Sequence, residues 1–307
     1  MEIYLPIAQI PVNWLVVLCI GGAVGFLSGM VGVSGGFITT PLLIFYGVPP
    51  AVVVSTQATP IAAASLVGTL RQGRRGAVDI KMGAFLLIGG LLGSLAGVQL
   101  FQMLQRLGQI DFVVEASYVL LLGGVGGLML NESVQAMRAV RQGRPAPGHG
   151  PGQHNWIHNL PFKMRFRASR LYISAIPVVV LGFLVGVMTA ILGTGGAFLL
   201  IPAKIYLLRM RTEIAVGTAQ FQMFVVAIAS TMMHAVTDHT VDAMLGLILA
   251  LGGVVGAQFG VRLGQQMRAD QLRAALGLLT VAIALRLLVG LVLPPDHLYS
   301  ASMTIAQ

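Results

Sequence analysis

The chain has 307 residues, of which 56% are hydrophobic and only 9% are charged, and its mean hydropathy is +0.86. Soluble domains carry roughly 25% charged residues, so this composition excludes an ordinary soluble domain and indicates an all-α integral membrane protein. A formal net charge of +9 is explained by basic loops at a membrane, so nucleic acid is not an expected partner. The single cysteine, Cys19, excludes a disulfide within the chain. We expect it to be a small buried side chain.

Ten apolar segments follow one another along the chain. Eight are long enough to cross a bilayer, because a helical span needs about 20 residues. Two are shorter and contain a proline, Pro41 or Pro202, and we interpret them as half-helices, broken or re-entrant. In chain order the segments are 12–31, 37–48 (short), 50–70, 82–103, 112–130, 171–192, 197–208 (short), 212–233, 243–263 and 274–293.

A glycine-rich break precedes each short segment, and the two breaks match. Gly-Val-Ser-Gly-Gly-Phe-Ile-Thr-Thr-Pro at 32–41 corresponds without a gap to Gly-Thr-Gly-Gly-Ala-Phe-Leu-Leu-Ile-Pro at 193–202. Further along, Gly-Gly-x-x-Gly-x-x-x-Gly at 89–97 recurs at 252–260. A nearly constant offset between several such landmarks indicates a duplicated chain. The expected organisation is a first repeat at 1–130, a linker at 131–170 and a second repeat at 171–307.

The basic residues predict the orientation. If the loops after the third, fifth, seventh and ninth segments are cytoplasmic, 17 of the 19 Lys and Arg residues lie on one side. Both termini are then outside and the linker is cytoplasmic. Because each half has five elements, an odd number, the two repeats enter from opposite sides and form an inverted repeat.

The linker is rich in proline, glycine and basic residues, which is typical of a flexible connection. Its histidines His149, His154 and His158 lack carboxylate or cysteine partners, so we expect a solvated tether near anionic lipid and no metal site. No cofactor is expected.

The two glycine-rich breaks are the main reason to predict a substrate-binding site. Half-helices beginning near Phe37 and Phe198 present free N–H groups and partial positive charge, which suit an anion. Buried amides and hydroxyls in the third and eighth segments could also bind it, although helix–helix hydrogen bonding explains them equally well. Arg286 lies deep in the last segment, where a charge is costly and usually functional. The candidate substrate-binding residues are Gly32, Ser34, Gly35, Gly36, Thr56, Gln57, Gly193, Thr194, Gly195, Gly196, Thr218, Gln220 and Arg286.

Other features have structural interpretations. Asp79 and Asp242 precede helices and are expected to be N-caps. The small-residue patterns, such as Gly182-x-x-x-Gly186, are expected to be packing faces. No catalytic constellation is present in the sequence, so an enzyme is not expected.

The doubled glycine break followed by Phe-x-x-x-Pro, together with the Val-Asp pairs at 78–79 and 241–242 and the Gly-Gly-x-x-Gly patterns, resembles the TauE/SafE family of sulfite exporter-like permeases. The resemblance covers nearly the whole chain outside the linker. It implies export of sulfite, sulfonates or other small sulfur-containing anions across a bacterial inner membrane. The second break has an alanine where the first has a glycine, so the two sides of a site would be unequal.

The leading hypothesis is therefore a secondary transporter of a small sulfur anion that works by alternating access. An anion channel, an uptake permease for another small organic anion, and a membrane partner acting through the basic linker are the alternatives. The coupling ion or proton and the oligomeric state stay open.

Overall fold

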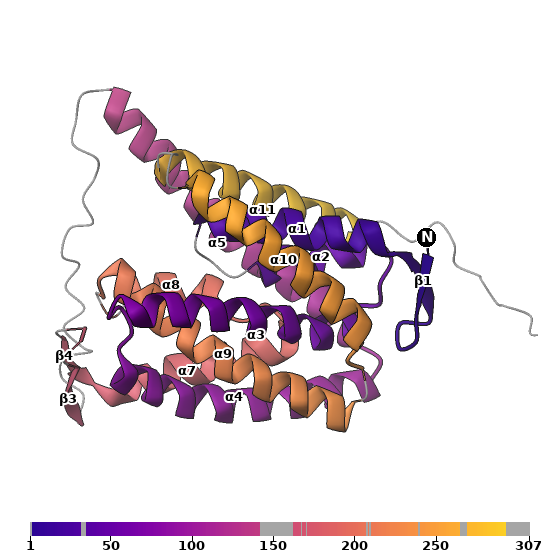
Figure 1. Cartoon of the computed structure of the whole chain (residues 1–307), viewed down its shortest axis with the longest axis horizontal. Helices are drawn as coiled ribbons and strands as arrows, with labels where there is room; N and C mark the ends of the chain where they lie inside the picture. The colour runs from indigo at the N-terminus through magenta and orange to yellow at the C-terminus, as the bar shows by residue number, and fades with distance from the viewer. Residues whose placement is uncertain are drawn as a thin grey trace, which may run out of the picture.

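The computed structural model is a bundle of long helices with a short β-hairpin before each half of the bundle (Figure 1). The structure describes residues 2–31, 35–141, 162–166, 168–169, 171–206, 208, 210–238, 240–264 and 269–292. The candidate site residues Gly32 and Ser34 and the linker histidines lie outside these described residues.

The two halves contain the same elements in the same order. The first half consists of β1 (Glu2–Leu5), β2 (Ile10–Asn13), α1 (Trp14–Val31), α2 (Gly36–Phe45), α3 (Pro50–Arg74), α4 (Ile80–Arg106) and α5 (Ile110–Arg141). The second half consists of β3 (Lys163–Phe166), β4 (Leu171–Ser174), α7 (Ala175–Leu192), α8 (Ala197–Tyr206), α9 (Thr212–Thr237), α10 (Ala243–Gly264) and α11 (Ala269–Val292).

The prediction of an all-α membrane protein is confirmed. Among the described residues, seven helices are long and apolar enough to cross a bilayer: α3, α4, α5, α7, α9, α10 and α11. The apolar helix of α1 is slightly shorter, and α2, like α8, has only 10 residues. The half-helices were therefore predicted with nearly correct bounds.

The hairpins were not predicted. The segment 171–192 was expected to be one span, but its first four residues form β4, which pairs antiparallel with β3. The segment 12–31 likewise begins with the end of β2, which pairs with β1. At the other end of the expected linker, α5 continues as far as Arg141. An aspartate of the opposite half accepts hydrogen bonds from the turn of each hairpin, Asp242 from Ile7 and Asp79 from Ser169. These bonds hold the two short hairpins against the bundle.

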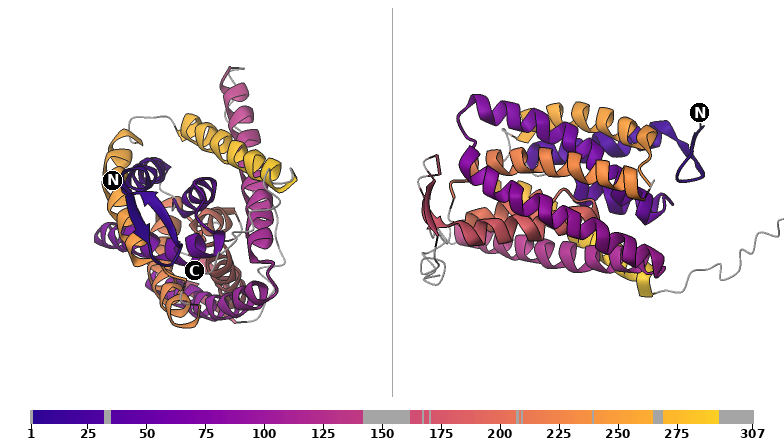
Figure 2. Two further views of the ribbon diagram at one scale, coloured as in Figure 1. Left: turned by 90° about the vertical axis from the view of Figure 1, so that its right-hand side faces the viewer. Right: turned by 90° about the horizontal axis from the view of Figure 1, so that it is seen from below.

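Helix pairing is unchanged when the two halves are exchanged. The two principal pairs are α1 with α10 and α4 with α7, and α3 pairs with α9 as α5 pairs with α11. The spans of α3 and α9 are the most buried, at 56% each, so this pair forms the centre. The hairpins lie at opposite ends of the bundle, with β1 at one end and β3 and β4 at the other (Figures 1 and 2). Therefore α1 and α7 start from opposite ends.

Glycines allow the two principal helix pairs to approach closely. A Cβ built on Gly186 of α7 would lie 2.2 Å from the Gly90 carbonyl oxygen, and one on Gly25 of α1 would lie 2.2 Å from the Gly253 oxygen. Backbone atoms on neighbouring helices cannot yield to a methyl group at that distance. The interpretation of these glycine patterns as packing faces is confirmed.

Two side chains differ from the expectation. Cys19 is exposed on α1, because the outer surface of a membrane protein is itself apolar and accepts a small hydrophobic side chain. Lys204, which was counted with the cytoplasmic loops, is fully buried on α8, and its Nζ has no hydrogen-bond partner in the part of the chain that the structure describes. Asp79 is the carboxylate whose charge acts on it.

Candidate functional site

The first glycine break ends at the start of α2, where the N-cap residue is itself a glycine. Gly35 is the N-cap of α2, and its carbonyl accepts the N–H groups of Ile38 and Thr39 at 3.0 and 3.1 Å. Gly35 has no side chain with which to cap α2, and the structure shows no side-chain cap bond from it. The first N–H groups of any helix lack intrahelical partners, and they carry the positive end of its dipole. This end of α2 is therefore prepared to receive hydrogen-bond acceptors.

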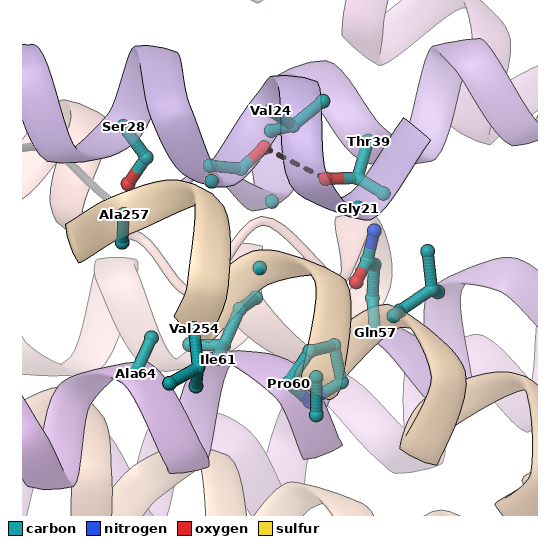
Figure 3. Close-up of a pocket in the computed structure, with 16 residues that line it drawn as sticks. Gly21, Val24, Ser28, Thr39, Gln57, Pro60, Ile61, Ala64, Val254 and Ala257 are labelled. Atoms are coloured by element: carbon teal, nitrogen blue, oxygen red, sulfur yellow. Dashed lines mark hydrogen bonds between the residues drawn. The ribbon is translucent and has the colours of Figure 1, made fainter. Parts of the chain in front are cut away.

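A pocket of about 60 Å³ lies against this helix start (Figure 3). Its walls come from α1, α2, α3 and α10. One water molecule requires roughly 10–15 Å³ by the same kind of measure, so the pocket can hold a small anion or a few waters. The described residues that line it include Ser28, Gly35, Gly36, Thr39 and Gln57, and they include no Asp, Glu, Lys or Arg.

Gln57 of α3 supplies the most informative side chain of the pocket. It is 1% exposed, its Nε2 has no hydrogen-bond partner among the described residues, and its amide points into the pocket (Figure 3). A buried amide N–H without a partner costs about 1–3 kcal/mol, so such a group is retained where a ligand or water completes it. Thr39 is different, because its hydroxyl already donates to the Gly35 carbonyl at 3.1 Å.

The loop of the second break is stabilised by a hydrogen bond between its own residues. Gly193, Gly195 and Gly196 all have positive φ, between 63° and 69°, a region that only glycine occupies without strain. The Thr194 hydroxyl accepts the Gly196 N–H at 3.3 Å, so it caps the loop and does not point at a ligand. This asymmetry agrees with the different residues of the two breaks.

The two breaks nevertheless meet in the middle of the protein. A Cβ on Gly36 would lie 3.0 Å from the Thr194 carbonyl oxygen and 3.2 Å from that of Gly193. Just beyond, the rings of Phe37 and Phe198 stack with centroids 4.3 Å apart. The structure therefore brings the two half-helix starts together, as expected from the sequence, with the pocket on the side of the first.

Thr56 and Thr218 join the halves and lie outside the pocket. The Thr56 hydroxyl accepts the Asp242 N–H at 2.9 Å, and the Thr218 hydroxyl accepts the Asp79 N–H at 3.0 Å. Both threonines are fully buried. Their matched geometry shows that helix–helix hydrogen bonding, one of the two alternatives for these residues, occupies both hydroxyls.

The two aspartates are N-caps, as predicted. Asp79 accepts the Met82 N–H at 3.1 Å, and its second oxygen accepts both the N–H and the hydroxyl of Ser169 in the β3–β4 turn. Asp242 caps α10 in the same way, and its second oxygen accepts the Ile7 N–H of the β1–β2 turn.

Two further candidates lie away from the pocket. Gln220 packs against Gly68, where a built Cβ would be 2.9 Å from its Cδ. Arg286 is exposed on α11, and its guanidinium carbon lies 5.4 Å from the centre of the Phe45 ring, a cation–π contact at the far end of α2. Phe45 gives this charge a favourable contact without any role at the pocket.

Sequence reasoning missed part of the pocket wall. Pro60 and Ile61, one turn beyond Gln57, line the pocket, as do Gly253 and Ala257 of α10. The α10 residues belong to the repeated glycine pattern, which had been assigned to packing alone. Thr39 lies inside the repeated break motif, so the motif itself contained the signal for it.

Seven helices among the described residues are long and apolar enough to cross a bilayer, which indicates a multi-pass membrane protein. A family model described as sulfite exporter TauE/SafE matches residues 17–287. The chain belongs to the TauE/SafE sulfite exporter family.

Curated relatives agree with this class. A protein of Xylella fastidiosa named "probable membrane transporter protein" is 26% identical over 269 residues, covering 86% of this chain and 91% of the relative. Two Bacillus subtilis proteins carry the same description. YunE is 22% identical and YjnA is 26% identical, and they cover 90% and 89% of this chain and 97% and 98% of their own lengths. No solved structure matches the chain.

Proposed function

We propose that this protein is a secondary transporter that exports a small sulfur-containing anion, such as sulfite or an organosulfonate, across a bacterial inner membrane. The proposed binding site is the pocket at the start of α2. The observation that carries the proposal is the buried Gln57 amide, whose Nε2 has no partner among the described residues and which lines this pocket beside the glycine-capped N-terminus of α2.

The chemistry of the pocket favours an anion over a cation. A helix N-terminus carries roughly half a positive charge and offers N–H groups to an oxyanion. The Gln57 amide adds a neutral donor, and no carboxylate among the described lining residues repels the ligand. Gly35 and Gly36 add no side chain of their own to the helix start, where Val24 and Ile61 already pack closely.

The sulfur chemistry of the substrate is supported by the family description alone. The matching family model is described as a sulfite exporter, whereas the relatives are named only as probable membrane transporters. A pocket of about 60 Å³ limits a fully enclosed substrate to a few non-hydrogen atoms. That size favours sulfite or a short sulfonate over a larger organic anion.

Alternating access is supported by the relation between the halves. Because α1 and α7 start from opposite ends of the bundle and the helix pairs exchange between halves, we propose an inverted repeat across the membrane. With the linker cytoplasmic, both termini lie outside. The two breaks then approach the centre from opposite faces, as in transporters that rock one repeat against the other.

Flux of radiolabelled sulfite in liposomes tests the site. Gln57→Leu removes one hydrogen bond to a charged ligand, worth about 1.5–3 kcal/mol, so apparent sulfite affinity should fall about 10- to 150-fold. Gln220→Leu is the matched control, because Gln220 lies outside the pocket, and it should transport like wild type. Unchanged sulfite affinity in Gln57→Leu would refute the proposed site.

The same liposomes distinguish a carrier from an anion channel. A carrier saturates and shows counterflow, in which trapped unlabelled sulfite accelerates uptake of labelled sulfite. Flux that rises linearly and shows no counterflow would favour the channel. Transport that survives deletion of residues 140–160 would exclude an essential role of the linker.

A further inference from the structure

A second set of buried polar atoms lies on two helices, one from each half of the chain. Both amide atoms of Gln222 on α9 and the hydroxyl of Ser94 on α4 have no hydrogen-bond partner in the described structure. Gln222 is 1% exposed and Ser94 is fully buried. Three unpartnered polar atoms within a membrane bundle are costly, and neither residue is used by the proposed site.

The surroundings of the two breaks correspond residue by residue. A Cβ on Gly35 would meet Val24 at 2.6 Å and Ser28 at 3.3 Å. At the second break, a Cβ on Gly196 would meet the counterparts of these residues, Val185 at 2.2 Å and Thr189 at 3.0 Å. The offset is 161 in every case, so each break packs on its preceding helix in the same way.

The helix pair that forms another wall of the first pocket, α1 with α10, also has a counterpart in α7 with α4. Gly25 meets Gly253 across the α1–α10 pair, and Gly186 meets Gly90 across the α7–α4 pair. Gly90 also faces Gln222, since its built Cβ would lie 3.2 Å from Nε2. The counterpart of the first pocket is therefore a region enclosed by α7, α8, α9 and α4.

Gln222 and Ser94, which carry the unpartnered atoms, correspond by sequence offset to residues that line the first pocket. With the offset of 162 that relates Thr56 to Thr218, Gln222 is the counterpart of Pro60. With the offset of 163 that relates Gly90 to Gly253, Ser94 is the counterpart of Ala257. Both Pro60 and Ala257 line the first pocket. The position of Gln57 itself is taken by Ala219, so the second half carries its amide one turn further along.

We propose that the second break holds a second anion-binding site, with Gln222 Nε2 and Ser94 Oγ as its donors. The ligand is a small oxyanion of the same chemical class as that of the first pocket. Because Gln222 Oε1 is also an unfilled acceptor, an anion that still carries an O–H group, such as hydrogen sulfite, fits best.

Equilibrium dialysis of the purified full chain against radiolabelled sulfite tests the proposal. Wild type should bind two equivalents. The double variant Gln222→Leu with Ser94→Ala should lose one of them and keep the equivalent that Gln57→Leu removes. Gln220→Leu, two residues before Gln222 on the same helix, is the control and should bind two. Replacing an unpartnered amide by leucine of similar size should not lower the melting temperature, so loss of binding will not reflect unfolding.

Each result decides the matter. Retention of all bound sulfite in the double variant overturns the second site, and so does a wild type that binds none. A single equivalent that disappears in both the double variant and Gln57→Leu also overturns it, because one shared site would explain both losses. If only Gln57→Leu removes sulfite, the proposed function stands and the second site falls. If only the double variant removes it, the first pocket is refuted.

Discussion

Thr56→Val removes the hydroxyl that accepts the Asp242 N–H at 2.9 Å, while keeping nearly the same side-chain volume. Asp242 is fully buried, so its N–H is left without a partner and without water. An unsatisfied buried donor costs about 1–3 kcal/mol, which changes the unfolding equilibrium constant about 5- to 150-fold. Thr218→Val removes the matching bond to Asp79 and should cost a similar amount.

The two bonds share no partner, so their costs should add in the double variant, to about 2–6 kcal/mol. The assay is reversible denaturation of the purified protein in mixed micelles, followed by helical circular dichroism. Thr56→Ser keeps the hydroxyl and is the matched control. Because neither hydroxyl lines the pocket, sulfite affinity of the folded fraction should be unchanged in every variant.

The opposite pattern would refute this reasoning. If Thr56→Val keeps wild-type stability but loses sulfite affinity, the hydroxyl binds substrate and its bond to Asp242 is incidental. Strong non-additivity of the double variant would instead show that the two junctions between the halves act as one unit.

Three further perturbations follow from the packing and the caps. Gly186→Ala places a methyl group 2.2 Å from the Gly90 carbonyl oxygen and should lower the free energy of unfolding by about 1–3 kcal/mol or more. Gly290→Ala is the control and should be neutral, because no described residue lies within 4 Å of a Cβ built there. The denaturation midpoints of the two variants test this difference. Asp79→Ala should destabilise by more than the roughly 0.5–2 kcal/mol of a simple cap, because the Ser169 contacts are lost too; equal stability of wild type and variant would contradict this. Tyr118→Phe removes the hydroxyl that donates at 2.6 Å to the carbonyl of Leu192, the last residue before the second break. The loss should lower the free energy of unfolding by about 1–3 kcal/mol and make the break more accessible to protease. Protease protection equal to that of wild type would show that Tyr118 does not hold the break in place.

Sequence reasoning found the helices because long apolar runs have few other solutions in a membrane. It found the half-helices because glycine and proline interrupt an apolar pattern at a recognisable place. It could not find the hairpins. Their strands are four residues long, and they depend on contacts with Asp79 and Asp242 that are remote in sequence.

The candidate site was predictable only in part. Gly35, Gly36 and Gln57 were named from the break and from buried polarity, and they lie together in the pocket. Thr56 and Gln57 are adjacent in sequence and equally buried, yet one hydrogen-bonds the other half and the other faces the pocket. Composition and spacing cannot tell which of the two residues faces the pocket. A helix turns about 100° per residue, so adjacent residues lie on different faces, and only the neighbouring helices decide what each face contacts.

The exchange of helix partners between halves has an evolutionary consequence. Since α1 packs on α10 and α4 on α7, neither half contains its own main packing partner. The contacts are those of a self-complementary homodimer whose two copies have been joined into one gene. An isolated half would expose its glycine face and leave an aspartate cap without its threonine. We therefore expect the two halves, made as separate chains in one cell, to assemble with each other.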